Sequence, residues 1–203
     1  MTATSRPRRS PDPQDRRRDA ERSRQALLSA ALDEFSEKGF DGARIQDIAA
    51  RAGVNKQLIA YYFGGKENLY REIQRNWQQR EAAMTDPALP LKQVADRYLA
   101  AGFAEPRAAR LMAWHGLTGG DPELNIDSAD TDLDNLRRAR DRGEFPAELD
   151  PEFLRTALLA IVSAPVIFPQ AAQGPGGIRP GSPEFENWYR DQLRTLLGRL
   201  AAE

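Results

Sequence analysis

Residues 45–63 hold side chains of the kinds that contact nucleic acids. Asn55, Lys56 and Gln57 stand together, and Tyr61 follows four residues after Gln57. A glutamine amide can make two hydrogen bonds to adenine, and a lysine ammonium can reach guanine or a phosphate. A tyrosine hydroxyl can donate to a phosphate. The chemistry on offer is therefore recognition of DNA, provided that folded elements present these side chains to a groove.

Catalytic chemistry has few candidates in this chain. There is no cysteine, and His115 is the sole histidine. No glycine-rich phosphate loop or serine-nucleophile elbow is present, and a metal site would have to combine carboxylates with His115. We therefore expect no catalytic residue, no metal and no cofactor. A small helical enzyme is the alternative class. DNA affinity that depends steeply on salt concentration would distinguish a DNA-binding protein from such an enzyme.

The spacing within residues 45–63 indicates a helix-turn-helix. Ala49 is small enough for two helices to cross closely, Gly53 accepts the positive φ of the turn, and Ile59 can be buried against the first helix. Ile48 and Val54 complete the apolar wedge. Short helical hairpins with glycine turns also occur without DNA, so this spacing alone leaves that alternative open.

Helical patterns surround this motif. Apolar residues at spacings of three and four predict a helix over 20–38, with Asp19 as its N-cap and Gly39 at its end. Further helices are expected at 44–52, 55–63, 66–84, 91–105, 106–117, 128–142, 151–168 and 183–202. No alternating strand pattern and no internal repeat occur. The fold class is all-α.

The domain organisation follows from composition. Residues 1–18 carry six arginines and almost nothing apolar, so we expect a disordered basic arm, either a solvated tail or an extra DNA contact. Residues 19–66 form the helix-turn-helix domain, the helix 66–84 connects, and residues 85–203 form a second helical domain. Pro87 and Pro90 mark the hinge.

Charge and hydropathy set further limits. Residues 1–80 have 16 Lys and Arg against 11 Asp and Glu, whereas residues 81–203 have 13 against 19. The basic part suits a polyanion, although a chance division of solvated charge gives the same numbers. No secretory signal is visible, and the longest apolar stretch, 157–168, is too short to cross a bilayer. We expect a cytoplasmic protein with no membrane partner.

Residues 22–70 resemble the DNA-binding domain of the TetR family of repressors. The resemblance rests on the string AALDEFSEKGFDGARIQDIAARAGVNKQLIAYYFGGKENLY, with Gly39-Phe40 at a helix end and Lys66-Glu67 opening the next helix. It implies a three-helix DNA-binding domain followed by a helical ligand-binding and dimerisation domain. The implied DNA-contacting residues are Arg44, Asn55, Lys56, Gln57, Leu58, Tyr61, Tyr62 and Lys66.

Three positions depart from the family pattern. Ala43 replaces a usual capping threonine, which removes a side-chain cap worth about 1 kcal/mol. Leu58 replaces a usual threonine, and Ala60 a usual tyrosine. Leu58 can contact a thymine methyl group or simply pack. We expect these changes to alter the DNA sequence that is read rather than to abolish binding.

The resemblance also implies a small-molecule pocket after residue 91 and a homodimer formed by the last two helices. The helix at 151–168 is apolar on almost every face, which suits a dimer interface or an ordinary monomer core. Candidate ligand contacts, each of which can equally be a core residue, are Tyr98, Phe103, Met112, Trp114, His115 and Phe168. The expected function is a repressor released from a palindromic double-stranded operator by a small molecule. A regulator without an effector, or an activator, is the alternative.

Overall fold

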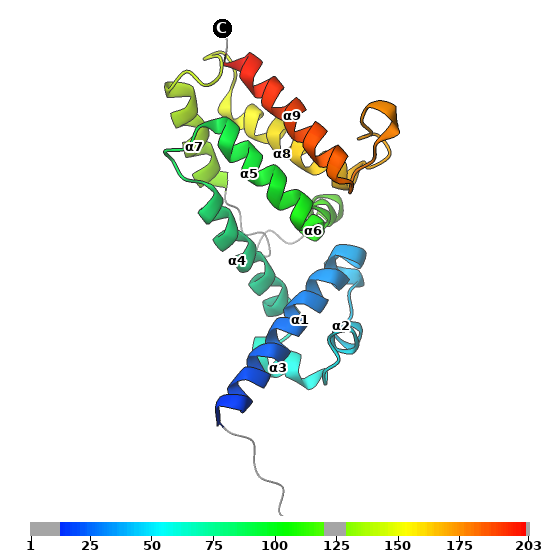
Figure 1. Cartoon of the computed structure of the whole chain (residues 1–203). Coiled ribbons are helices and arrows are strands. Elements are labelled where there is room, and N and C mark those ends of the chain that lie inside the picture. The colour runs from blue at the N-terminus through cyan, green and yellow to red at the C-terminus, as the bar shows by residue number, and fades with distance from the viewer. Residues whose placement is uncertain (1–12, 120–128, 202–203) are drawn as a thin grey trace, which may run out of the picture.

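The computed structural model describes residues 13–119 and 129–201, and every regular element in these two ranges is helical (Figure 1). The helices of the first part are α1 (Pro13–Gly42), α2 (Ile45–Ala52), α3 (Gln57–Phe63) and α4 (Lys66–Met84). Those of the second part are α5 (Leu91–Ala104), α6 (Pro106–Thr118), α7 (Ala129–Asp141), α8 (Pro151–Ile167) and α9 (Pro183–Leu200), with a short 3₁₀ turn, η2 (Pro175–Gly177). None of the helices in the described ranges is both long and apolar enough to span a bilayer.

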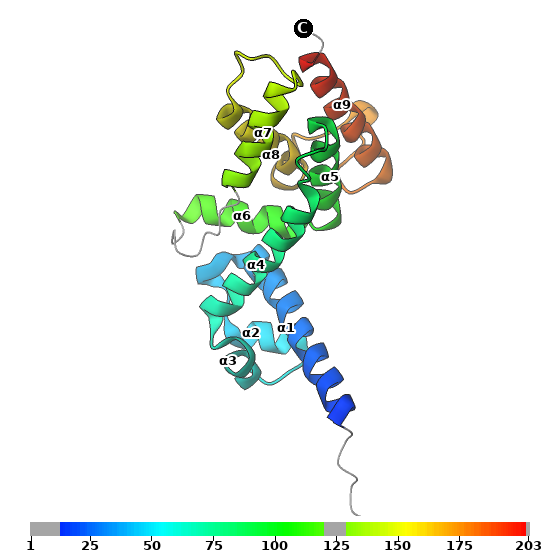
Figure 2. The same cartoon turned by 90° about the vertical axis from the view of Figure 1, so that its left-hand side faces the viewer.

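The helices form two groups with separate cores. The first group is α1 to α3 with the start of α4, and its core contains the fully buried Phe35, Ile48 and Ile59. The second group is α5 and α7 to α9, and its core contains Leu99 and Leu193. The long helix α4 leads from one group to the other, and α6 lies across the junction (Figure 2). A movement of α4 or α6 therefore reaches both groups.

Helix α1 begins at Pro13, seven residues before the predicted start at Ala20. The prediction of a disordered arm is therefore wrong for residues 13–18. These residues extend a helix that is already packed, so no new nucleation is needed. Pro13 suits a first turn, and Asp15 lies where the helix dipole favours an acid. Residues 1–12 of the predicted arm lie outside the described residues.

The other boundaries agree closely with the sequence pattern. Helix α4 has the predicted bounds, and α5, α6, α8 and α9 begin at the predicted residues. Gly39 has φ 71°, and Phe40 after it stacks on Phe35 at 5.9 Å between ring centroids. The chain thus turns back on its own helix at the predicted glycine.

Candidate nucleic-acid interface and cavity

The helix-turn-helix has the geometry that its spacing predicts. Gly53 adopts a left-handed φ of 68°, and the Val54 amide donates to the carbonyl of Ala49 at 3.0 Å. Ala49 is buried at the crossing, and Ile59 is fully buried against the first helix. Side chains on the outer side of α3 are consequently held on a rigid base.

Five of the predicted DNA-contacting residues are exposed. They form what we call the reading face: Arg44, Asn55, Lys56, Gln57 and Tyr61. Tyr61 is 79% exposed, whereas Phe63 two residues later lies in the core, as predicted. An aromatic side chain left in solvent on a well-packed helix contributes little to stability. Tyr61 is therefore available to an external partner.

Asn55 has a structural task as well. Its Oδ1 accepts the amide N–H of Gln57 at 2.9 Å, which satisfies a free donor in the first turn of α3. Gln57 opens the helix with its own side chain exposed. Helix α2 has no comparable cap: Arg44 precedes it without a side-chain bond, and Ala43 is buried in the core. The expected loss of a cap on that helix is confirmed.

Leu58, Tyr62 and Lys66 are only partly exposed. Leu58 and Tyr62 pack against the core of the first helical group. Lys66 begins α4 with its Nζ 4.6 Å from the Phe40 ring centroid and 3.5 Å from the carbonyl of Asp41. Burial lowers the pKa of the Lys66 ammonium, and the Asp41 carboxylate opposes that shift. These three residues support the reading face and border it.

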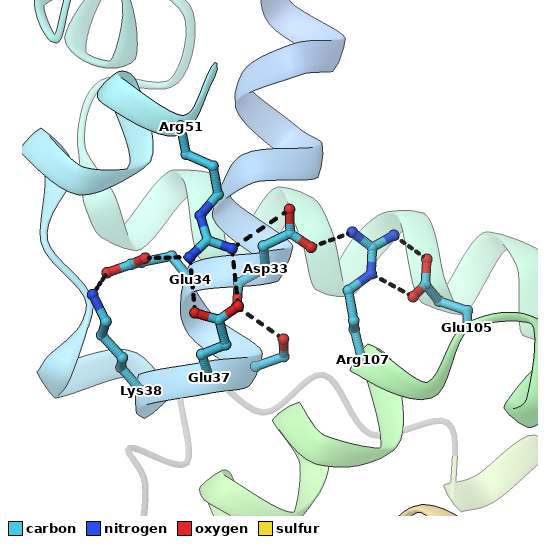
Figure 3. Close-up of polar contacts among 8 residues, drawn as sticks. Asp33, Glu34, Glu37, Lys38, Arg51, Glu105 and Arg107 are labelled. Carbon is cyan, nitrogen blue, oxygen red and sulfur yellow. Dashed lines mark hydrogen bonds and ion pairs between the residues drawn. The ribbon is translucent and has the colours of Figure 1, made fainter. Parts of the chain in front are cut away.

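A series of paired charged residues, hereafter the ionic chain, connects α1 and α2 to α6 (Figure 3). Asp33 on α1 accepts from Arg107 of α6 at 2.6 Å and lies 3.8 Å from Arg51 of α2. Arg107 also makes two bonds to Glu105, at 2.6 and 2.5 Å. These bonds raise the pKa of the Arg107 guanidinium, the bond to Glu105 most strongly. One carboxylate thus touches both α6 and the first helix of the helix-turn-helix.

The ionic chain continues over α1. Arg51 binds Glu37 through two bonds of 2.9 and 2.8 Å, and it lies 3.4 Å from Glu34. The hydrogen bond from Arg51 lowers the pKa of Glu37. Glu34 is only 1% exposed, and Lys38 is its second partner. A buried carboxylate needs such partners, so α2 is fixed on α1 by paired charges as well as by apolar packing.

Trp114 on α6 contacts α1 through one hydrogen bond and through the face of its ring. Its Nε1 donates to the carbonyl of Ser36 at 3.2 Å, and its ring covers Gly39. A Cβ at Gly39 would lie 3.1 Å from the Trp114 ring, so the glycine permits close approach as well as the positive φ. Trp114 is therefore an interhelical contact between α6 and α1.

A cavity of about 470 Å³ lies among α1, α4, α5, α6, α7 and α8. Three of the candidate ligand contacts, Tyr98, Met112 and His115, line this cavity. Tyr98 donates its hydroxyl to Asp132 at 3.0 Å, and burial raises its pKa. The wall includes Leu28 and Tyr70, which belong to the first core. An occupant of this cavity would thus touch both helical groups.

Phe103 and Phe168, like Trp114, do not line the cavity. Phe103 packs edge-to-face against Phe185 and Tyr189, in the second helical group. Phe168 follows α8 and is 61% exposed. Their aromatic character was the only reason for expecting them at a pocket, and it does not distinguish a pocket from a core or an outer surface.

Several residues of the site escaped prediction. Asp33, Arg51 and Arg107 lie in ordinary charged stretches, and their pairing spans 74 positions. Gln74 and Asn135 line the cavity from α4 and α7. The sequence signal for these two is faint: each is a neutral polar residue next to an inward-facing apolar one.

The chain is similar to known transcriptional regulators. Residues 27–73 match the family described as bacterial regulatory proteins, tetR family. The HTH-type transcriptional repressor SCO4008 of Streptomyces coelicolor is 31% identical over 160 residues, which cover 75% of this chain and 83% of that protein. The HTH-type transcriptional regulator RutR of Escherichia coli O157:H7 is 37% identical over 120 residues, or 56% of each chain.

Solved structures share the whole architecture. SCO4942 of Streptomyces coelicolor, described as a transcriptional regulator, superposes with a TM-score of 0.67 at 26% identity, covering 87% of this chain and 97% of its own. HlyIIR, a hemolysin II transcriptional regulator, has a TM-score of 0.59 and covers 91% and 99%. At 21% identity the second likeness concerns the fold alone. The similarity therefore extends from the helix-turn-helix through the second helical group.

Proposed function

Since the chain belongs to the TetR family of bacterial regulatory proteins, which are DNA-binding regulators of transcription, we propose that it represses transcription and is released from its operator by a small molecule. The observation that carries the DNA side of this proposal is the reading face. Its polar side chains and the 79% exposed Tyr61 stand on helices that are held by a core, a glycine turn and the ionic chain. Action on chromosomal DNA implies the cytoplasm.

In this proposal α3 lies in the major groove with its first turn nearest the bases. Gln57 reads adenine, and Lys56 reaches guanine or a phosphate. Arg44, Tyr61 and the partly exposed Tyr62 and Lys66 contact the backbone. Asn55 caps α3 and keeps its amide nitrogen for DNA, while Leu58 mainly packs.

The operator in this proposal is palindromic because the repressor is a homodimer. Apolar side chains stand exposed on the last two helices: Phe153 on α8 is 64% exposed, and Leu196 on α9 is 46% exposed. Large exposed apolar residues on neighbouring helices favour an interface with a second copy. Two-fold symmetry then places two copies of α3 about 34 Å apart, one turn of DNA.

The position of the cavity explains how a bound ligand would release the repressor from its operator. Its wall contains residues of α1 and α4 as well as the second helical group, and Arg107 and Glu105 of the ionic chain belong to the same wall. A ligand that fits one arrangement of these helices better than another shifts the population toward it. If that arrangement changes the spacing of the two α3 helices, the dimer leaves its operator.

A reporter experiment tests repression. A promoter carrying the DNA sequence that the chain selects from random duplexes is placed before a reporter gene. We expect expression to fall when the chain is produced and to remain high with Gln57→Ala. A rise in expression with the wild-type chain would show an activator instead. Sedimentation of Leu196→Glu tests the interface, since this variant should be monomeric and still helical.

A further inference from the structure

Two polar atoms of the cavity-wall residues have no hydrogen-bond partner among the residues that the structure describes. The Oε1 of Gln74 and the Nδ2 of Asn135 are both buried without one. The amide of Asn135 is oriented by its neighbour, because its Oδ1 accepts from Arg138 at 3.2 Å and leaves Nδ2 free. Buried polar atoms without partners cost stability, so native proteins keep few of them. An acceptor on α4 and a donor on α7 thus belong to residues that line the same cavity.

The rest of the wall offers mainly apolar surface. Leu32, Ile73, Trp77, Leu111, Leu136 and Val162 are among its residues. An occupant must therefore be largely apolar, because polar groups placed against these side chains would lose their hydration without compensation. Polar side chains interrupt this mainly apolar surface, and such a mixture is usual in a small-molecule site.

The charges of the wall already have partners. Arg142 is paired with Glu144 at 2.5 Å, and Arg107 with Glu105 and Asp33. Asp132 accepts from Tyr98, and Asp86 accepts the amide of Ala88. Glu81 and Arg155 also have interaction partners. Arg80 is exposed, and the remaining titratable side chains among the described wall residues are the neutral phenol of Tyr70 and the imidazole of His115. Among the described residues of the wall, an ionic ligand would therefore find no buried charge that lacks a partner.

We propose that the cavity binds a neutral, largely apolar molecule that donates a hydrogen bond to Gln74 and accepts one from Asn135. Carboxamides and lactams on a ring system are the simplest such class, since these molecules carry both an N–H donor and a carbonyl acceptor. This inference rests on the proposed function, because it assigns the chemistry of the effector site. Gln74 lies one turn after Tyr70, whose ring meets Phe35 and Phe40 at 5.1 Å. A ligand bound at Gln74 would thus lie directly beside the core of the first helical group, which supports the reading face.

Four probes with one ring frame test the chemical class on the full chain without DNA. They are 2-naphthamide, the anion 2-naphthoate, the cation 2-naphthylmethylammonium and naphthalene. Calorimetric titration should give the amide an affinity at least about tenfold higher than each of the others. Equal or tighter binding of the anion, the cation or naphthalene would overturn the proposal, and so would no binding of any probe at about 1 mM.

Two variants test the residues. Gln74→Leu and Asn135→Leu keep the approximate size of each side chain and remove its amide. Each should weaken 2-naphthamide binding about tenfold while leaving the ligand-free melting temperature unchanged or higher, because an unsatisfied polar group disappears. Gln93→Leu and Asn68→Leu, exposed positions outside the wall, are matched controls that should bind normally. Asn68 accepts from Arg71 just as Asn135 accepts from Arg138.

The outcomes separate this inference from the proposed function. Normal amide binding in both leucine variants would refute the assignment of Gln74 and Asn135 and leave DNA binding untouched. A lower melting temperature in both variants would show a structural role for these amides instead. Failure of the chain to repress its selected operator would refute the proposed function, whichever probe the cavity binds.

Discussion

The two helical groups have the same secondary structure but differ in how their helices are packed. The first group has a continuous core, its buried Glu34 has two cationic partners, and it carries the exposed side chains of the reading face. The second group, together with α1, α4 and α6, lines a cavity of about 470 Å³, and two amide atoms of its wall residues have no partner among the described residues. A surface that binds DNA has to be rigid. A domain that responds to a ligand needs a cavity and polar groups that the ligand can hydrogen-bond. The difference indicates where each function lies.

The largest expected effect compares two truncations of apolar side chains. Ile59→Ala should cost about 2–5 kcal/mol of unfolding free energy, because Ile59 is fully buried in the closed core. Leu158→Ala should cost about 1–2 kcal/mol, because Leu158 already borders the cavity and loses fewer neighbours. Urea unfolding followed by circular dichroism measures both. Equal losses would remove the contrast between a closed and an open core.

Next come changes on the reading face. Gln57→Ala should reduce discrimination at one base position by about 1–3 kcal/mol, because a bidentate contact is lost. Tyr61→Phe and Lys66→Ala should weaken binding to all sequences alike by about 0.5–1.5 kcal/mol, since we propose that these side chains contact the DNA backbone. Fluorescence anisotropy with the selected duplex and its single-base variants measures these effects. Unchanged affinity in all three folded, dimeric variants would contradict the assignment.

The connection between the two groups should show a smaller effect. In a double-mutant cycle with Arg107→Met and Asp33→Asn, urea unfolding should give a coupling energy of about 0.5–1 kcal/mol, because the pair is partly exposed. Arg107→Met should also lower operator affinity severalfold, since Asp33 adjoins Arg51 of α2.

Arg194→Met is the matched control for this connection. It breaks a similar pair with Asp96 at 2.8 Å, between α9 and α5 within the second group. It should change stability and leave operator affinity as it was. The same loss of DNA affinity in both variants would mean that the ionic chain has no special part in linking the groups.

The smallest effect concerns pH and the start of α8. Asp150 accepts the amides of Glu152 and Phe153 at 2.9 and 3.1 Å, and the bond from Phe153 lowers its pKa most. A lowered folded-state pKa gives stability that is present above the unfolded value, about 3.9, and is lost as pH falls through the folded value. Asp150→Asn keeps the cap and should remove this part of the acid dependence. An unchanged pH profile of unfolding below about pH 4 would contradict the expectation.

The sequence predicted helices well because they are local. Proline at the start of α6, α8 and α9, and glycine at the end of the first helical run, act on the residues beside them. The helix-turn-helix was equally accessible, since Ala49, Gly53 and Ile59 lie within eleven positions. The start of α1 was missed because propagation from a packed helix, rather than the composition of residues 13–18, decides it.

Contacts between distant residues were out of reach. Nothing local indicates that Arg107 meets Asp33, or that Trp114 covers Gly39. The cavity lining was half predicted, because an aromatic residue at helical spacing suits a core, a junction and a pocket equally. Gln74 and Asn135 acquire meaning only when the fold places both at one space and leaves an atom of each without a partner.

The central claim is that a two-fold pair of α3 helices reads DNA, and selection of bound duplexes from random sequence tests it most directly. The full chain is incubated with the pool at physiological salt, and the bound fraction is amplified and sequenced over several rounds. We expect a palindromic motif whose half-sites lie about 10 base pairs apart, or a multiple of that spacing, centre to centre. The same selection with Gln57→Ala should relax one position in each half-site. Enrichment of no motif, or of one without two-fold symmetry, would contradict the account.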